Sequence, residues 1–223
     1  MDAHTQWMNG LDGEVAFWDV FRTQHPDWFA AGMDRNRPLD QDVDDALAPF
    51  DDHPTVLDVG CGMLSSMGVV SRTGKHPTLL YADPLADCFA EIAKLQGFEL
   101  PIKIIRTMAE YLYMHFDTNS VDVVYCRNAL DHCSNLVRAL MGMAWPIGPK
   151  GSLILKHYLR CATRNNHQGL HQWDIYNDGG NLWIAGAGDI LDVGAIVAPL
   201  QLVALNRYTD DGEEMVRAIY RRD

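Results

Sequence analysis

An aspartate and two glycines follow a short apolar run in this chain, within the stretch PTVLDVGCGMLSS. The apolar, mostly β-branched residues around Asp58 predict a buried strand, and Gly60 and Gly62 predict a tight turn after it. Glycines in such a turn let a ligand lie almost against the backbone, because no Cβ blocks the approach. A pyrophosphate loop would carry a third glycine, where this chain has Ser65. The turn therefore favours a nucleoside-like ligand over a bound pyrophosphate.

Residues suited to ligand binding also follow the next three apolar runs. Asp83 ends the run in LLYADPLA, and a carboxylate there can accept hydrogen bonds from two vicinal ribose hydroxyls. The segments TMAEYL, residues 107–112, and CRNALDH, residues 126–132, follow the third and fourth runs. Ligands of open parallel sheets bind beyond the carboxyl ends of the strands, so these segments are expected to border one site.

Alternating strands and helices would position these segments. Strands are predicted over residues 55–59, 78–82, 102–105, 121–126 and 152–158, and helices over 65–71, 86–95, 109–114 and 135–143. Such alternation is typical of an α/β fold with a parallel sheet and helices on both faces.

The two ends of the chain have other patterns. Residues 11–29 have helical periodicity that His25-Pro26 is expected to break into two helices, and a short helix is expected over about 40–48. Near the C-terminus, QWDIYNDGGNLWIAG predicts two short strands around a turn. A helix over about 189–197 and an antiparallel pair of strands, 201–206 and 215–222, are expected after it.

Composition excludes several classes of partner. The chain has 223 residues, a net charge of −12 and 48 % apolar residues. This balance argues against nucleic acids and anionic membranes as partners, since those require clustered Lys and Arg. The N-terminus lacks a signal-peptide pattern, and no apolar run approaches the roughly 20 residues of a membrane span. A soluble, cytoplasmic protein is expected.

The cysteines and histidines do not predict a metal site. None of the five cysteines forms a C-x-x-C pair, so free thiols in a reducing cytoplasm are expected. The spacing His167-x-x-x-His171 is compatible with zinc on a helix, but Gly169 and the polar surroundings argue against a helix there. No metal is expected.

Four motifs occur in order at successive strand ends: VLDVGCG, an acidic end to the second strand, an AExL turn and VDVVYCRNALDH. Together they resemble the class I S-adenosylmethionine-dependent methyltransferases, and WPIGPKGSLIL resembles, in imperfect form, that family's entry to the fifth strand. The likeness covers about residues 55–158. It implies a Rossmann-like three-layer sandwich whose seven-stranded, mostly parallel sheet has an antiparallel C-terminal strand.

The resemblance implies S-adenosylmethionine as cofactor and S-adenosylhomocysteine as product. Asp58 would lie near the methionine amine, Asp83 would hold the ribose hydroxyls, and Ala109 would bind the adenine edge through its backbone. The family often has Asp where this chain has Met108, so Met108 is expected to pack on the adenine, with Glu110 as the candidate for the polar role. The expected cofactor-binding residues are Asp58, Gly60, Cys61, Gly62, Asp83, Pro84, Met108, Ala109, Glu110 and Arg127.

Two histidines are candidates for the base that takes a proton from a methyl acceptor. His132 follows Asp131 at the fourth strand end, and His171 lies in the aromatic segment HQGLHQWDIY. A structural role is the alternative for each: His132 as a cap or packing residue of the next helix, and the second segment as a surface hairpin with Trp173 half-buried. The expected catalytic residues are His171, His132 and Asp131.

The chain is expected to divide into an N-terminal helical lid or extension, residues 1–50, and a methyltransferase domain, residues 51–223. The expected activity is methyl transfer to a small polar acceptor such as a sugar, glycan or other metabolite, with O-methylation favoured over N-methylation. One alternative is a cofactor-binding scaffold without catalysis. The other is a nicotinamide-dependent dehydrogenase, against which Ser65 and the fourth-strand motif argue.

Overall fold

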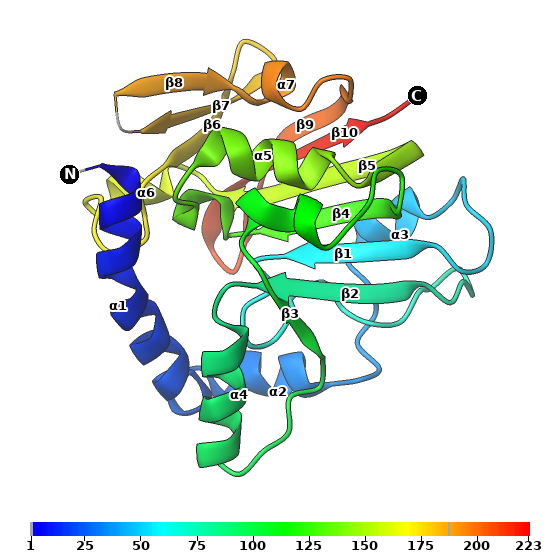
Figure 1. Cartoon of the computed structure of the whole chain (residues 1–223). Coiled ribbons are helices and arrows are strands. Elements are labelled where there is room, and N and C mark those ends of the chain that lie inside the picture. The colour runs from blue at the N-terminus through cyan, green and yellow to red at the C-terminus, as the bar shows by residue number, and fades with distance from the viewer. Residues whose placement is uncertain (1, 187) are drawn as a thin grey trace.

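One large sheet lies at the centre of the computed structural model, which describes residues 2–186 and 188–223 (Figure 1). Its strand order is β3-β2-β1-β4-β5-β10-β9. The strands are β1 Thr55–Val59, β2 Thr78–Asp83, β3 Ile104–Arg106, β4 Val121–Arg127, β5 Ile147–Tyr158, β9 Gln201–Asp210 and β10 Glu213–Arg221. β10 runs antiparallel to both of its neighbours, and the other pairs are parallel. The predicted seven-stranded sheet with an antiparallel C-terminal strand is confirmed.

The central strands build a core on each side of the sheet, because successive side chains point to opposite faces. Leu57 and Val124 pack toward α5 (Leu136–Ala144) on one side. Val56 packs on the other side, where α3 (Gln41–Ala46) covers the sheet. Helices on both faces complete the predicted three layers.

The predicted helices after β2 and β4 are confirmed with small shifts. α4 spans Ala86–Leu95 as expected. α5 begins at Leu136, one residue later than expected, because Asn135 is its N-cap and accepts a hydrogen bond from the Arg138 backbone N–H. The segment η1 (Ala109–Met114) has the expected bounds but is a 3₁₀ helix.

The predicted helix over residues 65–71 is wrong, because this segment pairs with the chain near residue 38. The backbone N–H groups of Leu39 and Asp40 donate to the carbonyls of Val70 and Met67 at 2.8 and 2.7 Å. Gly68 has a φ of +85°, and a Cβ there would lie 2.1 Å from the Pro38 carbonyl oxygen. Tertiary hydrogen bonds thus replace the helical ones after β1.

The second correction lies near the C-terminus. Residues 189–192 form a strand, β8 (Asp189–Asp192), and the helix α7 covers only Val193–Ile196. β8 pairs antiparallel with β7 (Asn181–Gly186), which pairs with β6 (Asp174–Asp178). The predicted hairpin over residues 174–186 is therefore confirmed, but a third strand extends it.

The N-terminal helices are longer than expected and break where expected. α1 spans Ala3–Gln24 and α2 spans Pro26–Met33, with His25 between them. Phe21 packs with residues of α4 and of the segment after β1, so α1 is held against the domain. Neither α1, with its 22 residues, nor any other helix in the described parts of the chain is apolar enough to span a membrane.

A buried ion cluster joins α3 to the sheet. Lys156 of β5 donates to both carboxylate oxygens of Asp40 at 2.7 Å and lies 2.7 Å from Asp42. Arg217 of β10 donates to the other oxygen of Asp42 at 2.6 Å. Lys156 is only 7 % exposed, so these carboxylates, rather than water, stabilise its positive charge.

Replacement of Lys156 should therefore destabilise the fold strongly. We expect Lys156→Ala to lower the free energy of unfolding by about 3–5 kcal/mol, because it leaves buried carboxylates without their partner. Urea denaturation measures the change. Arg106→Ala is the control, since the Arg106–Asp87 pair is exposed and should contribute about 1 kcal/mol or less. An equal decrease in the free energy of unfolding in the two variants would contradict the interpretation that the cluster is buried.

Candidate functional site

A cavity of about 900 Å³ lies at the carboxyl ends of β1, β2 and β4, and α1 runs past these strand ends (Figure 1). This volume is typical of sites that enclose a cofactor-sized ligand. All thirteen residues singled out from the sequence line it: Asp58, Gly60, Cys61, Gly62, Asp83, Pro84, Met108, Ala109, Glu110, Arg127, Asp131, His132 and His171. The structure thus brings together residues that lie up to 113 positions apart in the chain, from 58 to 171.

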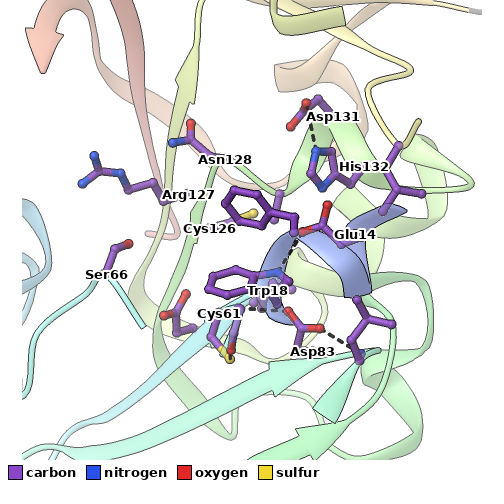
Figure 2. A pocket seen from close by; sticks show the side chains of 18 of the residues that line it. Glu14, Trp18, Cys61, Ser66, Asp83, Cys126, Arg127, Asn128, Asp131 and His132 are labelled. Carbon is purple, nitrogen blue, oxygen red and sulfur yellow. Dashed lines mark hydrogen bonds and ion pairs between the residues drawn. The ribbon is translucent and has the colours of Figure 1, made fainter. Parts of the chain in front are cut away.

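The glycine turn needs its glycines for backbone conformation and for close packing. Gly60 and Gly62 have φ values of +69° and +64°, which favour glycine. A Cβ on Gly60 would lie 2.3 Å from the Ala129 Cβ, and one on Gly62 would lie 2.5 Å from the Trp18 ring. Figure 2 shows the Trp18 indole beside Cys61 and Asp83. A side chain of α1 thus makes a close approach to Gly62.

Asp83 ends β2 as a buried carboxylate on the wall of the cavity. One of its oxygens accepts from the Gly62 backbone N–H at 3.0 Å, and the other accepts from the Leu85 N–H at 2.9 Å. Burial raises the pKa of Asp83 to about 6, although these two hydrogen bonds oppose the shift. Each oxygen has a further lone pair, so the carboxylate can still accept hydrogen bonds from a ligand.

Asp58 is a second buried carboxylate at the same edge of the sheet. The Ser65 hydroxyl donates to it at 2.6 Å, so the residue in the third-glycine position has a defined partner. Burial raises the pKa of Asp58 to about 7, and the nearby charge of Asp83 adds to the shift. Two carboxylates that are costly to ionise thus line one cavity, which favours a cationic ligand.

Glu110 and Arg127 each have partners inside the protein. Glu110 accepts from the Ser134 hydroxyl at 3.1 Å and from the Asn135 backbone N–H at 2.9 Å, and thereby holds the start of α5. Arg127 forms an ion pair with Asp210 of β9. Ala109 is packed tightly, since a Cβ on Gly142 of α5 would lie 2.1 Å from its carbonyl oxygen.

The two candidate histidines lie side by side around Asp131. The His171 Nδ1 is 2.7 Å from an Asp131 carboxylate oxygen, and the His132 Nε2 is 3.1 Å from the same His171 nitrogen. The hydrogen bond to Asp131 raises the pKa of His171. Burial would raise the pKa of Asp131, but His132 and the His171 hydrogen bond together hold it below its ordinary value. Figure 2 shows His132 and Asp131 at the cavity.

The segment that carries His171 is attached to the fourth strand end. The Gln172 backbone N–H donates to the Asp131 carbonyl at 3.0 Å, and the Trp173 indole donates to the Cys133 carbonyl at 2.8 Å. Trp173 is 6 % exposed, so the half-buried Trp173 of the surface-hairpin alternative is wrong. Hydrogen bonds across 40 residues of sequence therefore place His171 beside Asp131.

Several lining residues were not identified as site residues from the sequence. Cys161 lies 3.5 Å from the His171 Nδ1, and no local motif marks it. The tip of the β9–β10 hairpin contributes Asp210, Asp211 and Glu213, in a stretch whose sequence signals only a turn. The N-terminal helices, which the sequence offered as a lid or extension, supply an aromatic wall of the cavity: Trp7, Phe17, Trp18, Phe21 and Trp28.

Comparison with known proteins finds a family match for the central part of the chain. Residues 57–155 match a family model described as "Methyltransferase domain". No curated protein sequence matches the chain significantly.

Solved structures of similar fold are distant in sequence. The 1,6-didemethyltoxoflavin-N1-methyltransferase of Burkholderia thailandensis, solved with 1,6-didemethyltoxoflavin and S-adenosylhomocysteine, has a TM-score of 0.56 and 13 % identity, over 100 % of this chain and 91 % of that chain. A putative S-adenosylmethionine-dependent methyltransferase from Listeria monocytogenes has a TM-score of 0.50 and 13 % identity, over 80 % and 96 %. The [4+2]-cyclase SpnF has a TM-score of 0.51 and 13 % identity, over 81 % and 80 %. Identities this low show a shared fold alone.

The raised pKa of Asp58 gives a testable pH dependence. Between its usual pKa of 3.8 and about 7, the folded protein holds a proton that the unfolded chain releases. The contribution of Asp58 to stability therefore falls as pH rises through this window and is constant above it. We expect Asp58→Asn to gain about 2–4 kcal/mol of stability relative to the parent between pH 4.5 and 7.5, measured by urea denaturation.

Asp87→Asn is the control for this measurement, because Asp87 is exposed and pairs with Arg106 on the surface. It gives the baseline for the same substitution outside the cavity. A difference for Asp58→Asn that does not change with pH would show that Asp58 ionises normally in the folded protein.

Proposed function

We propose that this chain is an S-adenosylmethionine-dependent methyltransferase, because residues 57–155 match a methyltransferase-domain model and the sheet has the strand order of an open α/β fold. Its acceptor is a small polar molecule such as a sugar, a glycan or another metabolite, and oxygen is the methylated atom. One observation carries the proposal: residues from four successive strand ends, each suited to part of this cofactor, line one cavity. The five free cysteines support a cytoplasmic location.

The residues at the strand ends fit S-adenosylmethionine. When bound, it supplies a methyl group on a positively charged sulfur. Asp83 would accept hydrogen bonds from the ribose hydroxyls, and its spare lone pairs support this role. Asp58 would face the methionine amine, a cation that offsets the cost of ionising this buried carboxylate.

The adenine and methionine ends involve residues with other partners. Ala109 would bind the adenine edge through its backbone, and Met108 would pack on the ring. One carboxylate oxygen of Glu110 already holds the start of α5. A hydrogen bond between Glu110 and the adenine would therefore use its second oxygen. Arg127 lies at the end of β4, where its backbone would border the methionine group, while its side chain holds Asp210.

Asp131 and His171 form a hydrogen-bonded pair that can remove a proton. When Nδ1–H of His171 donates to Asp131, the neutral ring keeps its lone pair on Nε2. That nitrogen would accept the proton of an acceptor hydroxyl, while Asp131 orients the ring. A hydroxyl needs this proton removed, so the pair supports O-methylation over N-methylation. His132 is the second candidate, because its Nε2 lies in the same cluster.

The N-terminal helices would act as a lid. Aromatic side chains of α1 and α2 line the cavity, and the Trp18 indole lies against Gly62. A cofactor that passes close to the glycine turn would have to displace this ring. The proposed lid comprises residues 1–50. Of its three helices, α1 and α2 contribute residues to the cavity wall, whereas α3 covers the sheet.

A scaffold that binds the cofactor without methyl transfer is the second candidate. A structure of similar fold is named as a [4+2]-cyclase, so the fold by itself does not determine methyl transfer. Turnover of S-adenosylmethionine in the presence of pooled metabolites distinguishes the two, since a scaffold would produce no S-adenosylhomocysteine.

Cofactor binding tests the proposal first. We expect saturating S-adenosylhomocysteine to raise the melting temperature, because it binds only the folded state.

Asp83→Ala should weaken the affinity of the protein for S-adenosylhomocysteine roughly tenfold or more, since hydrogen bonds to a charged group contribute about 1.5–3 kcal/mol. Calorimetry measures both affinities, with Asp87→Ala as the control. A melting temperature raised by NAD and not by S-adenosylhomocysteine would overturn the cofactor assignment.

Replacement of the proposed base tests the chemistry. Once an acceptor is found by screening sugars, phenols and hydroxy acids, we expect His171→Ala to lower kcat at least about tenfold, as is typical of a general base. Its affinity for S-adenosylhomocysteine should stay within a few-fold. His167→Ala is the control, because His167 is exposed and outside the cavity. Parental turnover in His171→Ala, His132→Ala and the double variant would exclude both histidines as the base.

A further inference from the structure

Four side chains of the kinds that bind transition metals meet at one corner of the cavity. Asp131 and His132 belong to η2 (Leu130–His132), Cys161 begins α6 (Cys161–Arg164), and His171 precedes β6. Ligand atoms of Asp131, Cys161 and His171 all lie within 4.8 Å of one another. The His132 Nε2 lies 3.1 Å from the His171 Nδ1 and 3.5 Å from an Asp131 oxygen.

The His171 Nδ1 cannot form a hydrogen bond with every polar atom around it. The His171 Nδ1 is approached by an Asp131 oxygen at 2.7 Å, by the His132 Nε2 at 3.1 Å and by the Cys161 Sγ at 3.5 Å. A ring nitrogen carries either one proton or one lone pair, so it can form one strong hydrogen bond. With its proton directed to Asp131, it has nothing to offer the other two atoms, and these lie beside the Asp131 carboxylate as well. A cation would bind Asp131, Cys161 and His171 at once.

The spacing is close to that of a tetrahedral zinc site. Zinc bonds of about 2.0–2.3 Å place neighbouring ligand atoms about 3.3–3.6 Å apart. The Cys161–His171 and His132–Asp131 separations, both 3.5 Å, match this spacing, and the His132–His171 separation is slightly short. The 2.7 Å between Asp131 and His171 must open by about half an ångström to admit the ion.

The backbone around the ligands is well tied, so little ordering is needed on binding. The Arg160 N–H donates to the Ile175 carbonyl and the Gln172 N–H to the Asp131 carbonyl, both at 3.0 Å. The Thr163 N–H donates to an Asp174 carboxylate oxygen at 2.7 Å. These bonds link η2, α6 and the start of β6 into one frame.

We propose that this corner of the cavity binds a divalent transition metal of the zinc class. The ligands are the Cys161 thiolate, the His171 Nδ1 and an Asp131 oxygen, and the His132 Nε2 lies next to the last two. A thiolate and an imidazole select such a metal over magnesium or calcium, which prefer oxygen ligands. The proton of the Cys161 thiol and any proton on the His171 Nδ1 are released when the ion binds.

Metal binding and the proposed base role of His171 exclude each other. An ion on Nδ1 moves the ring proton to Nε2, so that nitrogen can no longer accept a proton from a hydroxyl. Zinc should therefore inhibit methyl transfer, and a chelator should restore it. This consequence, unlike the site itself, rests on the proposed function.

Metal binding is tested on the full-length, tag-free protein after removal of metals with a chelator. Zinc affinity is measured by competition with a coloured chelator, and cobalt is added as a spectroscopic probe of the thiolate. We expect about one ion to bind per chain, with a thiolate-to-cobalt absorption band. Cys161→Ser should lose this band, and both Cys161→Ser and His171→Ala should bind zinc at least about tenfold more weakly.

Matched controls come from the same chain. Cys88→Ser changes a free cysteine on α4, and His167→Ala changes an exposed histidine, and both should bind as the parent does. Absence of zinc binding in the parent, or a cobalt thiolate band that persists in Cys161→Ser, would overturn the site. Calorimetry with S-adenosylhomocysteine on the same metal-free protein reports separately on the proposed function.

Discussion

The parallel pairing of β1 with both β2 and β4 is the constraint on which the site depends. Parallel register brings Val59 opposite Ala82 and Asp58 opposite Tyr81 and Tyr125, so the three strands end together. The Gly60 N–H then reaches across to the Ala82 carbonyl at 2.8 Å. Because all three strands end at one edge of the sheet, the residues that follow each strand line the same cavity. The cost is electrostatic, since two carboxylates become buried close together.

The segment after β1 changes the character of the glycine turn. In dinucleotide-binding folds a helix starts here, and its N-terminus attracts a phosphate. In this chain the segment pairs with residues 37–40 instead, and Ser65 donates to Asp58. The turn therefore lacks a helix dipole and borders two carboxylates. This electrostatic environment suits a cation far better than an anion.

Both ends of the chain close the cavity over the strand ends. α1 and α2 contribute aromatic rings, while the β9–β10 tip contributes acidic side chains. The Arg127–Asp210 and Arg164–Glu213 ion pairs attach this tip to β4 and α6. The glycine turn thus lies beneath walls built from segments nearly 200 residues apart. Such walls can differ between proteins of one fold while the strand ends stay alike.

The sequence by itself determined the alternation of strands and helices, the sheet type and the strand-end residues. These follow from local patterns: apolar runs, a break at Pro26 and glycines that permit positive φ. It did not determine the conformation of residues 63–70, because hydrogen bonds to the chain near residue 38 compete with helix formation only once the two segments meet. It left His132 and His171 as rivals. The tertiary structure alone decided that both lie beside Asp131, with Cys161 next to His171, since contacts across 40 residues depend on how the chain returns and not on its local pattern.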